Sequence, residues 1–238
     1  MKNNFTIEQV CEFWDKVADV YDEVNKKIGS AHYQRFTESI KYLNLKNGDK
    51  ILNIWSRTGN AIPYLKNLAD HVEIHNLEVS LKMLAKAKEK FPIENFQLTD
   101  LRKFDFNDNF FDKILSLETL EHAPEPLALL SEFWRVLKPG GRLVMSLPPK
   151  TAEMPLKVYE MFFKNHGEGP HNFLASKKVK KMLEETGLRL VLHKGTLLFP
   201  VGPQKMQNLA EKIIEKMQWT PVKELGIRQF YVSEKPII

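Results

Sequence analysis

The sequence predicts an α/β fold in which a mostly parallel sheet is covered by helices on both faces. Apolar runs rich in β-branched residues alternate with runs of helical spacing from about residue 46 to residue 148. Such alternation is typical of βαβ units, which build parallel sheets. A length of 238 residues and a hydrophobic content of 43% suffice for the core of one large domain.

The chain is predicted to open with an amphipathic helix. Thr6 and Gln9 form a capping-box pattern. Apolar residues then recur at helical spacing, at Val10, Phe13, Trp14, Val17, Val20, Tyr21 and Val24. A second helix is predicted from about His32 to Leu43, before a turn at Asn47 and Gly48.

The alternating elements follow in the middle of the chain. The predicted strands are 50–55, 71–77, 95–99, 112–117 and 142–148, and the predicted helices between them are 60–69, 80–91 and 127–137. Ligands of parallel sheets bind beyond the carboxyl ends of the strands. Residues that directly follow each strand are therefore the first candidates for a binding site.

The pattern loosens after Pro148, where residues 149–174 contain one predicted helix and a loop rich in Gly, Pro and His. We expect this segment to form a lid. Helices over 176–187 and 205–219 and strands over 188–195 and 228–233 are predicted to complete the sheet. The expected organisation is a single domain over 1–238, made of a helical cover (1–45), a core (46–148), the lid (149–174) and the second half of the sheet (175–238).

Composition excludes several classes of protein. Cys11 is the only cysteine, which excludes an intrachain disulfide and a cysteine-rich metal site. No run of about 18 apolar residues and no signal-peptide layout is present, so no membrane span is predicted and a cytoplasmic protein is expected. The formal net charge of +5 is compatible with an anionic substrate and leaves peripheral contact with an anionic surface open.

Nucleic acid is not an expected partner. The basic run at 177–181 lies on a predicted helix that also carries Glu184 and Glu185, which favours a solvated face. A basic stripe with interleaved stacking aromatics is missing. The oligomeric state has no signature in the sequence.

Two positions around the first two strands indicate a nucleotide-like ligand. Gly59 closes the loop after the first strand, and Glu78 follows the second strand 19 positions later. An acid about 20 residues after a glycine-bearing βα turn suits a ribose, because one carboxylate accepts hydrogen bonds from both hydroxyls. This spacing does not name the nucleotide.

Three stretches, 77–91, 99–143 and 170–188, resemble the class I S-adenosylmethionine-dependent methyltransferases, most closely their small-molecule, type 11-like branch. The most specific run is 135-RVLKPGG-141, although Pro and Gly also end helices for local reasons. The resemblance covers about residues 10–190. It implies a Rossmann-like, seven-stranded sheet with a lid after strand five, and S-adenosylmethionine as the cofactor, with S-adenosylhomocysteine as its product.

The resemblance also implies a cofactor site. Glu78 matches the acid that holds the ribose, and Asp100 with Leu101 matches the pair that contacts the adenine. The other matching positions are Val79 on the second face of the adenine, Ser116 and Leu117 at the amino-acid end, and Tyr21, which would close over that end. Each position has a structural alternative, since an aspartate at a strand end also caps turns and Tyr21 would otherwise be a core aromatic.

The loop after the first strand departs from the family pattern. Where the family usually has D-x-G-x-G-x-G, this chain has Asn53, Trp55, Arg57 and Gly59. Glycines there permit positive φ and a close approach to the cofactor. Arg57 would offer a cation to the cofactor carboxylate, whereas Trp55 would occupy the place of the methionine part. Either the altered loop still holds the cofactor, aided by Ser56 and the strand-end acids, or the fold is retained with a weakened pocket.

Methyl transfer by direct displacement requires alignment and exclusion of water, with no metal and no covalent nucleophile. A phenol or a carboxylic acid acceptor reacts as its anion, whereas an alcohol needs a general base. The base candidates are His171 in the lid and His122 after the fourth strand, where the competing role is a hydrogen bond that orders the loop.

The acceptor class follows from motifs that are missing. Residues 116–122 lack the Asn/Asp-Pro-Pro-aromatic run of amino-group methyltransferases, and no carboxylate set of magnesium-dependent catechol enzymes is present. A small-molecule or lipid-like acceptor is therefore expected. The alternative function is a non-catalytic scaffold with an impaired cofactor loop, supported by Trp55 and Arg57. A nicotinamide dehydrogenase would need G-x-G-x-x-G, which 51–60 does not contain.

Overall fold

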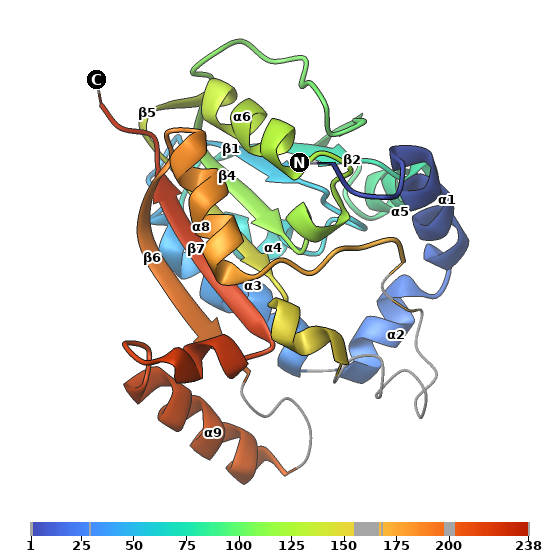
Figure 1. The fold of residues 1–238 in the computed structure, drawn as a ribbon. Coiled ribbons are helices and arrows are strands. Elements are labelled where there is room, and N and C mark those ends of the chain that lie inside the picture. The colour runs from blue at the N-terminus through green and yellow to red at the C-terminus, as the bar shows by residue number, and fades with distance from the viewer. Residues whose placement is uncertain (1, 29, 155–166, 168, 198–202, 238) are drawn as a thin grey trace.

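A seven-stranded sheet forms the centre of the computed structural model, which describes residues 2–28, 30–154, 167, 169–197 and 203–237 (Figure 1). The strand order is β3-β2-β1-β4-β5-β7-β6. All pairings are parallel except those of β7, which runs antiparallel to β5 and β6. The strands are β1 (Lys50–Ile54), β2 (Glu73–Glu78), β3 (Asn95–Leu98), β4 (Phe111–Leu117), β5 (Leu137–Leu147), β6 (Arg189–Thr196) and β7 (Arg228–Glu234). The predicted α/β class with a mostly parallel, seven-stranded sheet is confirmed.

The helices pack on both faces of this sheet. One buried cluster joins it to α1 (Ile7–Val17), α6 (Pro126–Val136) and α8 (Ser176–Glu185), and a second joins it to α3 (Ser30–Leu43) and α4 (Ile62–Lys66). α5 (Leu81–Lys90) contributes Met83 to the first cluster and Leu84 to the second. Among the helices that the structure describes, none is long and apolar enough to cross a membrane.

The N-terminal cover differs from the prediction. The expected single helix is two helices, α1 and α2 (Tyr21–Ile28), separated by a turn in which the Val20 N–H donates to the Val17 carbonyl. The apolar spacing continues across this turn, so the sequence pattern did not reveal the break. The predicted capping box of Thr6 and Gln9 at the start of α1 is confirmed. The break places Tyr21 at the start of α2.

The start of β5 also differs from the prediction. β5 begins at Leu137 and not at Arg142, because the Pro139-Gly140-Gly141 run continues as strand after a register shift against β4.

Of the predicted lid, residues 155–166 and 168 lie outside the described residues, and so does the helix expected there. The two ends of the lid meet where Pro149 forms a parallel bridge with Leu174.

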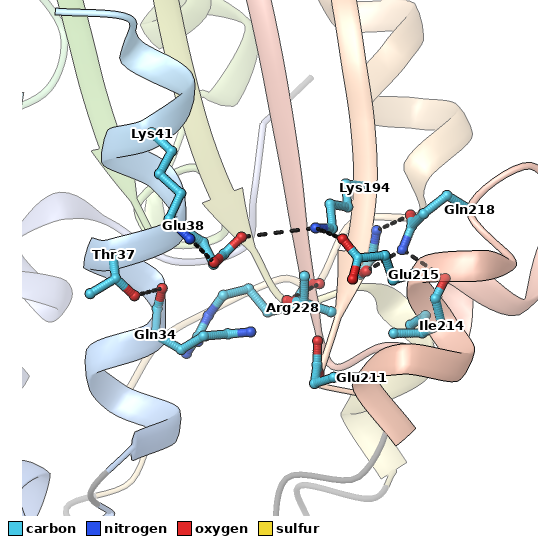
Figure 2. Close-up of polar contacts among 12 residues, drawn as sticks. Gln34, Thr37, Glu38, Lys41, Lys194, Glu211, Ile214, Glu215, Gln218 and Arg228 are labelled. Atoms are coloured by element: carbon cyan, nitrogen blue, oxygen red, sulfur yellow. Dashed lines mark hydrogen bonds and ion pairs between the residues drawn. The ribbon is translucent and has the colours of Figure 1, made fainter. Parts of the chain in front are cut away.

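Polar contacts fasten α9 (Gln204–Lys216) to the far edge of the sheet (Figure 2). Lys194 on β6 lies 3.8 Å from Glu38 on α3 and 3.5 Å from Glu215 on α9. The amide of Gln218 donates to the Gly195 carbonyl at 2.7 Å. α3, β6 and α9 are thereby joined on the side of the sheet opposite to β3.

The register of the central strands positions the candidate site. Ile54 at the end of β1 pairs with Leu77 on β2 and with Ser116 on β4. The carboxyl ends of these three strands therefore meet at one edge of the sheet, where parallel sheets bind ligands.

Candidate functional site

The loop from Trp55 to Gly59 has a glycine-type backbone although two of its glycine positions carry large side chains. Trp55 and Arg57 have φ angles of 54° and 55°, and Gly59 has 81°. Left-handed backbone costs a residue with a Cβ about 1–2 kcal/mol. A Cβ at Gly59 would lie 2.8 Å from the ring of Phe91, so this glycine is needed for packing. The loop therefore has the left-handed backbone that glycine favours, and it carries two large side chains on that backbone.

These two side chains form a clamp with Trp14 of α1. The guanidinium carbon of Arg57 lies 3.7 Å from the ring centroid of Trp14 and 3.9 Å from that of Trp55. All three residues are buried. Among the described residues, Nη1 of Arg57 has no hydrogen-bond partner. A desolvated cation between two indoles is worth about 2 kcal/mol or more, so the Trp14–Arg57–Trp55 clamp holds α1 against the loop.

Glu78, the acid expected to hold the ribose, is fully buried. Its carboxylate accepts backbone hydrogen bonds from Arg57 at 2.6 Å, Val79 at 2.9 Å and Ser80 at 3.0 Å. Burial raises the pKa of Glu78, and the Arg57 charge and these N–H groups oppose that rise. In this structure Glu78 ties the end of β2 to the loop and is closed to solvent.

The space left at this edge is small. A cavity of about 20 Å³ holds about one water molecule, whereas ligand pockets measure about 300–1,000 Å³. The residues around it include Tyr21, Arg35, Asn53, Trp55, Ser56, Arg57 and Leu117. The structure thus brings together five of the predicted cofactor contacts, at Tyr21, Asn53, Trp55, Ser56 and Leu117, around one small cavity.

Three polar groups near the cavity have contrasting environments. The Asn53 amide donates to the Asn76 side chain at 2.8 Å and is thereby held on the β2 side of the sheet. The hydroxyls of Ser56 and Ser116 are buried without a partner among the described residues. Buried hydroxyls usually find a hydrogen bond, so both remain available to a bound group.

The adenine side of the predicted site is more open. The side chain of Asp100 is 45% exposed and accepts hydrogen bonds from the Arg102 backbone at 3.0 Å and guanidinium at 2.8 Å. Partial burial opposes ionisation, but these bonds outweigh it and lower the pKa of Asp100. Leu101 and Val79 are buried in the same cluster as the clamp. Asp100 therefore remains accessible, in contrast to Glu78.

A buried ion-pair cluster lies directly after β4. Glu118 pairs with Arg35 of α3 and, at 3.0 Å, with Arg228 of β7. Arg35 also donates to the Tyr21 hydroxyl at 3.1 Å. Burial alone would raise the pKa of Glu118. The charges of Arg35 and Arg228 outweigh this effect and hold the pKa of Glu118 well below its ordinary range. The cluster links α2, α3, β4 and β7 beneath the cavity.

Sequence reasoning missed Glu118, Arg35, Arg228 and Trp14 as parts of the site. Glu118 offered a signal, because it follows a strand at the ligand-binding edge. The arginines offered none, since they lie 83 residues before and 110 residues after Glu118.

His122, a predicted base, lies behind the clamp. Its Nδ1–H donates to the Pro170 carbonyl at 2.8 Å, and its ring lies edge-on to Trp14 and Trp55. Burial, together with the Arg57 charge, lowers the pKa of His122 to about 3. A neutral imidazole with so low a pKa is a weak base at neutral pH, so the geometry favours the competing role of ordering the 169–171 loop.

His171, the other predicted base, is partly buried on that loop. Its Nδ1 lies 2.8 Å from the Gly169 carbonyl, and its ring centroid lies 6.2 Å from that of His122. The structure therefore brings the two histidines together beside the clamp.

Known proteins match this chain across the strands that build the site. A family profile for a methyltransferase domain matches residues 52–145. A demethylmenaquinone methyltransferase of Thermotoga maritima is 30% identical over 162 residues, which are 67% of this chain and 71% of that relative. The chain belongs to the class I S-adenosylmethionine-dependent methyltransferases. As a member of this family it is an S-adenosylmethionine-dependent methyltransferase, as the resemblance implied.

Further relatives of this methyltransferase share its fold over different lengths. Phosphoethanolamine N-methyltransferase 3 of Arabidopsis thaliana is 26% identical over 220 residues, 81% of this chain, which spans only 44% of that relative. A phosphoethanolamine N-methyltransferase 2 of Haemonchus contortus was solved with phosphomonomethylethanolamine and S-adenosylhomocysteine. It matches with a TM-score of 0.63 and 18% identity over 86% of this chain and 53% of its own. At that identity the likeness concerns the fold alone.

The methyltransferase cofactor does not fit the pocket as the side chains lie in this structure. Asp100 is accessible at the adenine side. Glu78, the predicted ribose ligand, is fully buried, however, and Trp55 and Arg57 stand where the family usually has glycines. S-adenosylmethionine is the cofactor of this family, and in this structure the side chains of Trp55 and Arg57 narrow the pocket that would receive it.

Proposed function

We propose that this methyltransferase methylates a small-molecule or lipid-like acceptor at the edge where the carboxyl ends of β1, β2 and β4 meet. The observation that carries the proposal is this aligned edge in a chain of the methyltransferase family. The names of the relatives support the acceptor class, since they refer to demethylmenaquinone and phosphoethanolamine. We further propose that the chain acts in the cytoplasm.

The acceptor is proposed to ionise by itself or to attack as a neutral amine. With a pKa lowered to about 3, His122 cannot take a proton efficiently at neutral pH. Phenols, carboxylic acids and amines need little help from a base, whereas an alcohol needs it. The proposed acceptors are therefore a phenol or hydroquinone, a carboxylic acid, or an amine, and His171 is the base that we would expect for an alcohol.

We propose that Asp100 and Leu101 bind the adenine with Val79, and that the backbone of Ser116 and Leu117 meets the amino-acid end. Glu78 is the proposed ribose ligand once the pocket has opened. The exposure of Asp100 supports its assignment, because a ligand can reach its carboxylate without any rearrangement.

The test is a calorimetric titration of the full chain with S-adenosylhomocysteine, followed by transfer of a labelled methyl group from S-adenosylmethionine to phenol, hydroquinone, carboxylic acid and amine acceptors. We expect binding, and a loss of about tenfold or more in affinity for Asp100→Ala. The matched control is Asp105→Ala, an exposed aspartate five residues further on. Equal affinity of Asp100→Ala and the parent would contradict the assignment of the adenine side. Absence of methyl transfer to every acceptor despite binding would favour a scaffold.

A further inference from the structure

We propose that Trp55 and Arg57 set the cofactor affinity of this methyltransferase by closing its pocket. In the closed state the Arg57 guanidinium lies in the clamp between Trp14 and Trp55, and the cofactor binds only after Arg57 leaves the clamp. The proposal rests on the proposed function, because it concerns the same cofactor site.

The first support is the backbone of the loop. Trp55 and Arg57 keep left-handed φ angles of 54° and 55°, which glycine adopts without strain. The retained conformation keeps the loop ready for a ligand, while the side chains occupy the space that the ligand needs.

The second support is that Arg57 contacts both the clamp and Glu78. Its side chain stacks in the clamp, and its backbone N–H donates to Glu78 at 2.6 Å. A movement of the side chain alone would empty the clamp and leave this backbone bond intact. A glycine at position 57 keeps that same N–H, so it removes the obstruction without removing the support of Glu78.

The third support is that the outer wall of the clamp is a separate helix. Trp14 lies on α1, which is fastened to α5 by Asp15, a partner of the Ser80 hydroxyl and of the Lys82 N–H at 3.0 Å. In Figure 1, α1 lies beside α5 at the end of the sheet that contains β2. Loss of the Arg57 stack therefore removes one contact from the inner side of α1, where Val10 and Val17 still pack in the core, while α5 holds its outer side.

Calorimetry with S-adenosylhomocysteine on the full chain tests the closure. We expect Arg57→Gly to bind about tenfold or more tightly than the parent, and Trp55→Gly to bind more tightly as well. The matched control is His71→Gly. His71 is exposed, has a φ of 57° and lies in another loop. This change relieves the same backbone strain and should leave the affinity unchanged.

Hydrogen exchange of α1 gives a second readout that does not depend on activity. Addition of S-adenosylhomocysteine to the parent should speed exchange in Ile7–Val17, because Arg57 leaves Trp14 when the pocket opens. In Arg57→Gly, the exchange of α1 should already be fast before the ligand is added.

The outcomes separate this inference from the proposed function. Equal affinities of the parent, Arg57→Gly and Trp55→Gly would overturn the closure and leave the methyltransferase assignment standing. If no variant binds although circular dichroism shows an intact fold, the cofactor assignment falls, and the closure falls with it. Tighter binding by Arg57→Gly, with His71→Gly unchanged, supports both.

Discussion

Glu118 shows how much one carboxylate can hold together in this protein. It neutralises Arg35, which is buried, and Arg228, which is partly buried, and these two arginines come from opposite ends of the sequence. Loss of one partner from a buried ion pair leaves an uncompensated charge, which costs more than the pair itself contributes. The fold around β4 and the cavity therefore depends on this side chain.

We predict that Glu118→Gln lowers the free energy of unfolding by about 3 kcal/mol, at the low end for buried pairs, because 24% of the Glu118 side chain remains exposed. Urea denaturation at pH 7 measures the loss. Glu12→Gln is the control, since Glu12 forms an exposed i,i+4 pair with Lys16 that is worth at most about 0.5 kcal/mol. Similar losses in the two variants would show that the cluster contributes little.

At the same residue scale, the candidate site was only partly predictable. The unusual loop was visible in the sequence because Trp55 and Arg57 occupy glycine positions. The clamp was not, because it depends on which way the Arg57 side chain turns and on Trp14, which lies 41 residues before Trp55. The assignments of Glu78, Asp100 and the histidines to ligand or acceptor remain predictions.

At the scale of elements, the side chain of Ser80 connects α1 to α5. Ser80 caps α5 by accepting the Met83 N–H at 3.1 Å, and its hydroxyl donates to Asp15 on α1. Helix capping and helix docking therefore share one side chain.

Ser80→Ala should cost about 1 kcal/mol of stability, the usual value of an N-cap, and should speed hydrogen exchange in α1 more than in α6. Urea denaturation and exchange mass spectrometry measure the two effects. Ser131→Ala is the matched control, because Ser131 is an exposed helical serine that bonds only to the Leu127 carbonyl of its own helix. Unchanged exchange in α1 would mean that the docking of α1 on α5 through Asp15 does not depend on the Ser80 hydroxyl.

The elements themselves were well predicted because their signals are local. Alternation of apolar strands and helical runs is set by neighbouring residues, and the capping box needs only Thr6 and Gln9. The α1–α2 break escaped because apolar spacing continues through Ala18–Val20. The early start of β5 escaped because Gly140 and Gly141 exchange backbone hydrogen bonds with Lys235, which lies 94 residues or more further along the chain.

At the scale of the whole molecule, three buried histidines control the response to acid. Burial is the main cause that lowers the pKa of His32 to about 2, of His122 to about 3 and of His193 to about 4. All three rings are neutral in the folded chain at neutral pH. In the unfolded chain they take up protons near pH 6.5.

The unfolded state therefore binds more protons than the folded state as the pH falls below about 6.5, and stability decreases there. Each histidine contributes up to about 1.4 kcal/mol per pH unit in this window. Urea midpoints between pH 7.5 and 5 measure how steeply the free energy of unfolding changes with pH. His122→Gln, which can still donate to Pro170, should reduce this slope by the contribution of one histidine. A slope that His122→Gln leaves unchanged would show that His122 is protonated in the folded chain.

The position of β7 has a consequence for how the protein is made. β7 comes last of the described strands in the sequence, yet it lies between β5 and β6 in the sheet. During synthesis on the ribosome, β6 leaves the exit tunnel before its neighbour exists, and the edge of β5 stays open for the same interval. Open edges recruit strands from other chains, so the nascent protein is most prone to aggregation just before Arg228–Glu234 emerge, and a stop codon ahead of that stretch would make this vulnerable state permanent.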